Sequence, residues 1–360
     1  MTHTFKPYLR LLKQSVLFWT PAMILFSIFR YYGIDAEEGL AVAKNYNSTL
    51  GIFYNFIKLI NIGVLTGILY ATIDYLFDIV TKQKVLWTNH IVIRLLFHFI
   101  ISLATFTTIT KVFTVFTQTS ITEHTGWFPI SKSFWAVILY ILLASIGFSF
   151  IKIANENFGK GVFLKMLLGK YKSPQEEKRI FMFLDLKDST SIAEKLGHFR
   201  YSQLIQDCFY DLNKVVPKHH AEIYQYVGDE VVLSWPYKKG LADNNCVNLF
   251  FAFQQRKQSK SQYYLDKYGM IPEFKAGLHG GKLIVTEVGI VKKEIAYHGD
   301  VINTSARIQG QCNHYQVPLL ISDKLIRDLK ISANLTCQFL GSVLLKGKQE
   351  EVDIHTIVRV

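Results

Sequence analysis

The sequence predicts two parts of different fold class: a helical domain with four membrane-spanning helices, followed by an α+β domain. Four long apolar segments precede residue 152, and helix and strand patterns alternate after residue 179. Half of the 360 residues are hydrophobic, and the mean hydropathy is +0.19, which is unusual for a soluble protein. We therefore expect a membrane domain over 1–151, a helical connector over 152–178 and an α+β domain over 179–360.

The four apolar segments are each near the roughly 20 residues that a spanning helix needs. They are Ser15–Phe29, Leu59–Phe77, Ile91–Ile109 and Phe134–Ile151. Basic residues precede the first segment, as in a signal peptide, but no small-residue cleavage site follows it. We expect the first segment to be retained as a helix.

Lysine and arginine in the short flanks orient the segments, because basic flanks stay on the cytoplasmic side. They occur in the N-terminal arm, in the second loop and after the fourth segment, whereas the first loop holds Asp35, Glu37 and Glu38. We expect a multi-pass protein of the cell inner (plasma) membrane. Both termini and the α+β domain would then be cytoplasmic.

The formal charge of +12 favours contact with anionic membrane lipid. The basic residues are scattered and form no platform with aromatic residues, so we expect no nucleic-acid partner. The four cysteines are Cys208, Cys246, Cys312 and Cys337, with no CxxC pair. We expect them to be reduced, in neither disulfides nor a zinc site.

Three ionisable residues lie within the apolar segments: Asp74 in the second, and Arg94 and His98 in the third. An antiparallel helix pair would bring them to similar depth. Ionisable groups inside a bilayer indicate a sensor or a proton path. A structural ion pair between two helices is the simpler explanation, and both interpretations stay open.

The connector is expected to continue the fourth helix from Lys152 to Lys170, and Pro174 then ends the helical pattern. An apolar seam suits a partner helix in a dimer and consists of Phe158, Val162, Leu167 and Leu168. A passive linker is the alternative.

The first motif of the second half is Arg179–Thr190, RIFMFLDLKDST. Five apolar residues lead into Asp185, and capping residues follow, which predicts a buried strand, a tight turn and a helix start. A carboxylate at a strand end suits a hard cation, and free backbone N–H groups at a helix start suit phosphates. An ordinary turn with a capping Asp is the alternative.

Two further motifs strengthen the functional interpretation. Tyr224–Trp235, YQYVGDEVVLSW, predicts a β-hairpin with Asp229 at its tip. Two carboxylates at neighbouring strand ends are suited to two Mg²⁺ or Mn²⁺ ions. In Gly299–Arg307, Asn303 and Arg307 are four residues apart on an expected helix and share one face.

The remaining patterns complete the expected α+β domain. Helix patterns cover Ile192–Leu196, Tyr201–Val216 and Asn244–Tyr268, and strand patterns cover Glu222–Tyr226, Val231–Trp235, Glu273–His279, Leu283–Thr286, Val317–Ile321, Cys337–Val343 and Val352–Val358.

The ordered motifs FLDLKDST, YVGDE, GLHGGK, YHGDVINTSARI and LLKGK resemble the catalytic domain of class III adenylate and guanylate cyclases. The resemblance covers roughly residues 175–358, about half of the chain. The N-terminal half resembles the multi-helix anchors of bacterial members in pattern only. The resemblance implies a ferredoxin-like core, a nucleoside triphosphate substrate and a head-to-tail homodimer with shared active sites.

The resemblance also implies roles for individual residues. Asp185 and Asp229, with the carbonyl of Leu186, would hold two Mg²⁺ or Mn²⁺ ions per active site. Asn303 would orient the ribose, and Arg307 would stabilise the transition state. The residues implied in binding the triphosphate are Lys187, Asp188, Ser189, Thr190, Lys282 and Lys346.

Two positions depart from the family pattern. Purine cyclases usually read the base with a Lys four residues before the second metal-binding Asp, and this position is Gln225 here. The Asp, Thr or Cys that usually assists is replaced by Ala296. Activity is therefore expected with uncertain base specificity.

We expect a membrane-anchored adenylate cyclase that converts ATP to 3′,5′-cyclic AMP and pyrophosphate. A guanylate or pyrimidine cyclase is the alternative among enzymes. A catalytically silent membrane receptor with a cyclase-like dimerisation domain is the alternative from another class, and the presence of the metal and transition-state residues argues against it. A transporter would need more spans and more polar groups within them.

Overall fold

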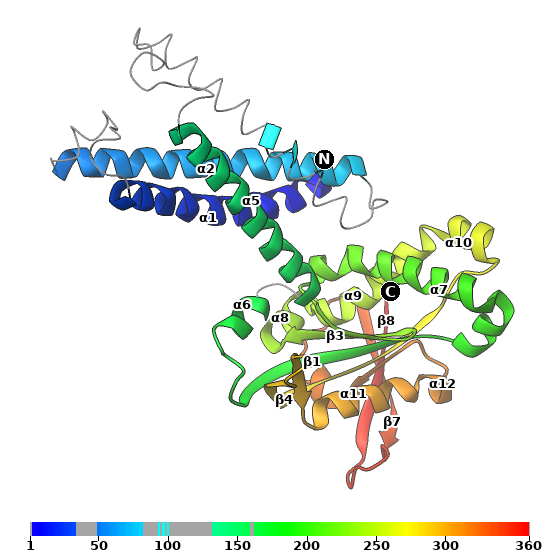
Figure 1. Ribbon diagram of the computed structural model, residues 1–360. Coiled ribbons are helices and arrows are strands. Elements are labelled where there is room, and N and C mark those ends of the chain that lie inside the picture. The colour runs from blue at the N-terminus through cyan, green and yellow to red at the C-terminus, as the bar shows by residue number, and fades with distance from the viewer. Residues whose placement is uncertain are drawn as a thin grey trace. The chain divides into compact units, whose positions relative to one another are not determined.

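The computed structural model describes residues 2–33, 49–81, 132–158 and 162–359, together with five positions between 93 and 100 (Figure 1). The chain divides into two compact units, Met1–Asn157 and Phe158–Val360. Each unit is described by itself.

The N-terminal unit contains the helices α1 (Thr2–Gly33), α2 (Thr49–Thr81) and α5 (Lys132–Phe158). The backbones of α1 and α2 approach closely at two glycines of α2. A Cβ atom on Gly63 would lie 2.6 Å from the Cα of Thr20, and one on Gly67 would lie 2.6 Å from the Cα of Val16. Small residues one helical turn apart allow two helix backbones to pack this closely.

One helical segment in the described part of the chain, Ile138–Asn155, is long and apolar enough to cross a membrane by length and composition. Leu11–Phe26 and Ile60–Leu76 are shorter apolar helices. Most of the expected third segment, Ile91–Ile109, lies outside the described residues. The four-span arrangement therefore stays a prediction.

Asp74 is buried in α2 and forms an ion pair with Lys152 of α5, with 3.6 Å between the carboxylate oxygen Oδ2 and Nζ. The partners expected from the sequence, Arg94 and His98, lie outside the described residues. An ion pair that joins two helices agrees with the simpler of the two interpretations of Asp74.

The helix expected over Lys152–Lys170 ends before Lys170. Helix α5 covers the connector to Phe158 and helix α6 covers Val162–Leu167, while residues 159–161 lie outside the described residues. A turn follows, in which Gly169 has a φ of 69°. Such a left-handed residue ends a helix, so the prediction was wrong over its last residues.

The first six major elements of the C-terminal unit are β1 (Gln175–Leu186), α7 (Ser189–Val215), β2 (Glu222–Val227), β3 (Glu230–Pro236), α9 (Asn245–Gln258) and β4 (Phe274–Val288). Their strands lie in the order β2-β3-β1-β4, and each neighbouring pair is antiparallel. A βαββαβ chain with this order is the ferredoxin-like arrangement. The implied core fold is therefore confirmed.

The later strands extend the sheet on the β4 side. Helix α10 (Ser261–Tyr268) lies between α9 and β4 in the chain. The elements after β4 are β5 (Glu294–His298), α11 (Asp300–Gly310), α12 (Cys312–Tyr315), β6 (Leu319–Ser322), α13 (Asp323–Ile326), β7 (Leu335–Val343) and β8 (Val352–Arg359). Strand β6 runs parallel to β4, and β8 and β7 follow it. Strand β5 pairs with the end of β4. The short elements α8 (Tyr237–Leu241), η3 (Val216–His219) and η4 (Ala242–Asn244) complete the unit.

Helices cover both faces of the central strands, with α7 and α9 on one face and α11 on the other (Figure 1). The strand residues Ile180, Met182 and Leu184 are fully buried with Leu204 of α7, while Phe181 is buried in a second cluster on the opposite face. A strand that is covered on both faces needs an unbroken apolar run. This explains the five apolar residues that precede Asp185.

Two expected boundaries in this unit were wrong. The strands expected at Glu273–His279 and Leu283–Thr286 form one continuous strand, β4, because Gly280 and Gly281 stay extended and pair with β1. The helix expected over Asn244–Tyr268 is two helices, since α9 ends at Gln258 and α10 starts at Ser261.

Packing of α11 on β4 gives a testable prediction. A Cβ atom on Gly277 would lie 2.2 Å from the backbone nitrogen of Gln309, so Gly277→Ala forces α11 away from the sheet. We expect a loss of about 1–3 kcal/mol in the free energy of unfolding, as for overpacked cores. The matched control is Gly310→Ala, whose Cβ would meet no atom within 4 Å. Urea unfolding of the purified full chain measures both, and equal midpoints for the two variants would contradict this packing.

Candidate active site

The carboxylates predicted from the sequence meet at one end of the sheet. Asp185 lies near the end of β1, and Asp229 lies in the two-residue turn between β2 and β3. Pairing of β1 with β3 sets Asp185 directly opposite Glu230, the residue after Asp229. We call Asp185 and Asp229 the carboxylate half-site.

The charges at this edge repel one another. Burial raises the pKa of Asp185; Lys275 opposes this shift, and the charge of Asp229 adds to it. Burial, then the charges of Asp185 and Asp229, raise the pKa of Glu230 to about 7. Like charges at this distance disfavour ionisation of both carboxylates, and a bound cation would offset the repulsion.

Two residues that the sequence analysis missed hold Asp185. The ammonium of Lys275, opposite Asp185 on β4, lies 3.3 Å from Oδ2. The side-chain amide of Gln309 donates to the same oxygen at 3.1 Å. Neither residue belongs to a local motif with Asp185; only the strand pairing and the packing of α11 bring them together.

The carboxylate half-site fits divalent ions as one part of their coordination. Within the residues that the structure describes, no group of three or more His, Cys, Asp or Glu side chains is arranged to hold a metal ion. Mg²⁺ in nucleotide sites is usually bound by one or two carboxylates and by substrate phosphates, with water completing the shell. Asp185 and Asp229 provide two carboxylates of this kind, and Leu186 provides a backbone carbonyl next to Asp185.

The turn after β1 leads directly into a long helix. Asp188 adopts a left-handed conformation with a φ of 56°, and α7 starts at Ser189. The backbone N–H of Lys187 donates to the carbonyl of Glu273 at 2.9 Å, and its ammonium lies 3.1 Å from the Glu273 carboxylate. The first N–H groups of a helix have no partner within the helix, so Ser189 and Thr190 offer donors to an anion.

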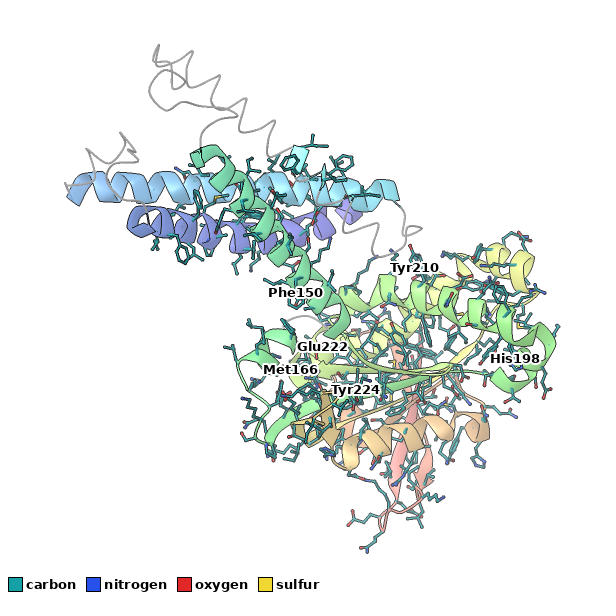
Figure 2. All side chains as sticks on the ribbon, viewed as in Figure 1. Phe150, Met166, His198, Tyr210, Glu222 and Tyr224 are labelled. Atoms are coloured by element: carbon teal, nitrogen blue, oxygen red, sulfur yellow. The ribbon has the colours of Figure 1, made fainter. Side chains whose placement is uncertain are left out.

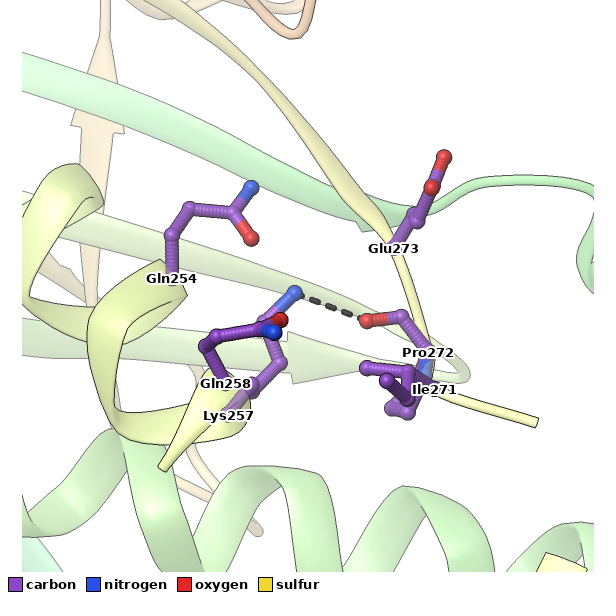
Figure 3. A pocket seen from close by; sticks show the side chains of 6 residues that line it. All are labelled: Gln254, Lys257, Gln258, Ile271, Pro272 and Glu273. Atoms are coloured by element: carbon purple, nitrogen blue, oxygen red, sulfur yellow. Dashed lines mark hydrogen bonds between the residues drawn. The ribbon is translucent and has the colours of Figure 1, made fainter. Parts of the chain in front are cut away.

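A cavity of about 180 Å³ borders this turn through Glu273 (Figure 3). Its lining residues are Gln254, Lys257, Gln258, Ile271, Pro272 and Glu273. The buried ammonium of Lys257 donates to the carbonyl of Pro272 at 2.8 Å, and burial lowers its pKa to about 8. The Lys187–Glu273 ion pair therefore joins the turn to the wall of this cavity.

The other residues predicted for the site lie on α11, on the loop beside it or on β4 next to its start. Asn303 is exposed and Arg307 is half-buried on this helix. A Cβ atom on Gly347 would lie 3.5 Å from the Arg307 guanidinium, so the loop that carries Lys346 lies against Arg307. Lys282 is followed on β4 by Leu283, which packs against Gly299, the residue before α11. We call Lys282, Asn303, Arg307 and Lys346 the cationic half-site.

Helical geometry separates the two half-sites within one chain. Arg307 and Gln309 are two residues apart on α11, which is about 200° around the helix axis. Gln309 contacts Asp185, so Arg307 points away from the carboxylates of its own chain. Lys282 also lies seven positions from Lys275 along β4, roughly 23 Å in an extended strand. Its ion-pair partner is Glu176, at 2.8 Å.

The two positions that depart from the family pattern lie on strands in contact. Gln225 is exposed on β2 and follows an irregularity in the pairing with β3, and Ala296 is half-buried on β5. Their neighbours Tyr224 and Tyr297 pack edge to face, with 4.8 Å between ring centroids. Figure 2 labels Tyr224 on the ribbon of β2. Strand β5, which pairs with the end of β4, thus contacts β2 through this ring pair.

Comparison with known proteins gives consistent results. A family model described as the adenylate and guanylate cyclase catalytic domain matches residues 171–358. Adenylate cyclase 2 of Rhizobium meliloti (strain 1021) is 34% identical over 221 residues, covering 61% of each chain. Adenylate cyclase 1 of the same organism is 26% identical over 185 residues, covering 50% of this chain and 27% of its own.

The fold also has a solved counterpart. A bacterial light-regulated adenylyl cyclase matches with a TM-score of 0.51 and 17% sequence identity, covering 61% of this chain and 64% of that chain. The chain spans less than two thirds of the length of these relatives. Because the family model covers more than half of the residues, the chain belongs to the adenylate and guanylate cyclase catalytic domain family.

Proposed function

We propose that this protein is a membrane-anchored nucleotide cyclase in cyclic-nucleotide signalling. It converts ATP to 3′,5′-cyclic AMP and pyrophosphate, in a homodimer with shared active sites. The observation that carries the proposal is the opposite orientation of the two half-sites on one chain. A head-to-tail partner would set the cationic half-site of one protomer against the carboxylate half-site of the other.

Asp185, Asp229 and the carbonyl of Leu186 would hold two Mg²⁺ or Mn²⁺ ions. Such ions neutralise the triphosphate and make the ribose 3′-hydroxyl a better nucleophile. In one chain without substrate, Lys275 and Gln309 hold Asp185 at the strand end. Precise placement of the carboxylate matters, because misplacement of reacting groups by about 1 Å costs orders of magnitude in rate.

The other residues bind and orient the nucleotide. The N–H groups of the turn at Lys187, Asp188, Ser189 and Thr190 would hold the β- and γ-phosphates at the start of α7. Lys282 and Lys346 would add positive charge to the triphosphate. Asn303 would orient the ribose, and Arg307 would donate to the α-phosphate as charge develops there.

Base recognition depends on Gln225 and Ala296. ATP is favoured because the two curated relatives described above are named adenylate cyclases. The amide of Gln225 offers one donor and one acceptor on a planar group, which can face adenine or, after a half turn, guanine. A guanylate or pyrimidine cyclase is therefore the second candidate, and a silent receptor is the third.

Product identification separates these candidates. The purified full chain is incubated with each of the four nucleoside triphosphates and Mn²⁺, and the products are identified by mass. Cyclic AMP as the main product supports the proposal, and cyclic GMP or a cyclic pyrimidine nucleotide supports the second candidate. A complete lack of turnover with an intact fold favours the silent receptor.

Complementation tests the shared site. Asp185→Asn and Arg307→Ala should each lower kcat by about 10²-fold or more, since each removes transition-state charge stabilisation. Mixing equal amounts of the two variants produces heterodimers in which one of the two sites is intact, so about a quarter of the wild-type activity should return. The control is Asp266→Asn, an exposed residue of α10 that should leave kcat unchanged. Heterodimers that form without any activity would contradict shared sites.

Substitution of the base readers tests specificity. The double variant Gln225→Lys with Ala296→Asp should raise the ratio of kcat/KM for ATP over GTP, because a lysine donates only and cannot flip. The wild-type protein should turn over GTP detectably with Mn²⁺. A wild-type ratio already above ~10⁴, which is typical of a site with dedicated polar readers, would show that other residues read the base.

Membrane topology has its own test. The proposal includes a multi-pass anchor in the inner (plasma) membrane with contact to lipid, and with both termini cytoplasmic. A single cysteine placed at Ser48, in a chain whose native cysteines are replaced by serine, should react with an impermeant reagent from outside. A cysteine at Lys172 in the same background is the control that should react only after lysis. Reaction of the Ser48 position from the cytoplasmic side alone would rule out the four-span topology.

A further inference from the structure

A second set of reactive side chains lies on the opposite side of β4 from β1. Cys337 is on β7, His355 is on the adjacent strand β8, and Asp323 is the first residue of α13. The Cys337 thiol lies 3.5 Å from Nδ1 of His355, and Nε2 of His355 lies 3.1 Å from Oδ1 of Asp323. None of the three belongs to the cyclase half-sites.

We propose that Cys337, His355 and Asp323 form a nucleophilic thiol site that is oxidised by small peroxides. A nucleophile within hydrogen-bond distance of a base, with the base oriented by a third group, is the arrangement that activates serine and cysteine nucleophiles. Here the three groups come from three elements that the fold brings together.

The hydrogen-bond partners of the His355 imidazole determine which ring nitrogen carries the proton. The carboxylate of Asp323 accepts from the Nε2–H of His355, so the neutral imidazole carries its proton on Nε2 and its Nδ1 accepts from the thiol. The guanidinium of Arg327 lies 2.5 Å from the other oxygen of Asp323 and holds the carboxylate. The ring of Phe339, the residue that pairs with His355 across the strands, packs on the imidazole with 5.3 Å between centroids.

The other three cysteines differ in both burial and partners. Cys208, Cys246 and Cys312 are buried, and burial raises the pKa of each thiol to about 12. Cys337 is half-buried. Burial and the charge of Asp323 also raise its pKa, so the thiol rests protonated. Its reactivity therefore depends on the transfer of the thiol proton to His355 during attack.

The oxidation step balances with peroxide as the oxidant. The sulfur of Cys337 attacks one oxygen of hydrogen peroxide, an S–O bond forms and the O–O bond breaks. The thiol proton moves to Nδ1 of His355, which then protonates the leaving hydroxide to water. The sulfur is oxidised to a sulfenic acid, and the peroxide is reduced to water and the sulfenic hydroxyl.

The test compares the four cysteines of the full chain in one sample. The protein is treated with limiting hydrogen peroxide in the presence of dimedone, and the sulfenic adduct at each cysteine is quantified by mass spectrometry over time. We expect adduct formation at Cys337 at least tenfold faster than at Cys208, Cys246 or Cys312. Equal rates at all four cysteines would overturn the proposal.

Two variants test the base and its orienting carboxylate. His355→Gln should lower the rate at Cys337 at least tenfold, and Asp323→Asn should lower it about three- to tenfold. His198→Gln, at the exposed histidine of α7 labelled in Figure 2, is the matched control and should leave the rate unchanged. The three buried cysteines report folding in each variant, because unfolding would expose them. The proposal is wrong if both variants keep the rate at Cys337 within twofold of wild type.

Discussion

Strand β1 and its pairing on both edges are the constraint on which the candidate active site depends. Every residue from Arg179 to Asp185 pairs with β3 on one side and with β4 on the other. This double pairing fixes the position of Asp185 near the end of the strand. It also sets Lys275 and Glu230 opposite Asp185, so the polar surroundings of the carboxylate follow from the register of three strands. A shift of one residue would turn every side chain of β1 to the other face.

Helix α11 connects this edge to the rest of the site. Gly277 lets the helix backbone approach β4, and the amide of Gln309 thereby reaches Asp185. The same helix carries Arg307 on its opposite side, beside the loop of Gly347. One rigid element thus holds a carboxylate of one half-site and presents the arginine of the other. This geometry is the basis of the proposal that two protomers share each active site.

The edge of the sheet formed by β8 and β7 carries the proposed thiol site. The pairing of β7 with β8 sets Cys337 and His355 within hydrogen-bond distance, and α13 adds Asp323. The loop between these two strands carries Lys346. Cys337 and His355 therefore lie on the same hairpin as one residue of the cationic half-site. The two proposed sites therefore lie on one sheet and have no side chain in common.

The sequence alone determined the elements whose cause is local. The apolar run before Asp185, the hairpin around Asp229 and the helix with Asn303 and Arg307 were all predicted correctly, because hydrophobic periodicity and turn residues act over a few positions. Only the tertiary structure decided what surrounds Asp185. Gln309 is 124 residues away in the chain, and Lys275 is placed by strand pairing. Contacts at such separations depend on strand register and packing, which a local sequence pattern does not encode. For the same reason, the sequence did not predict the continuous β4 or the Cys337–His355–Asp323 site.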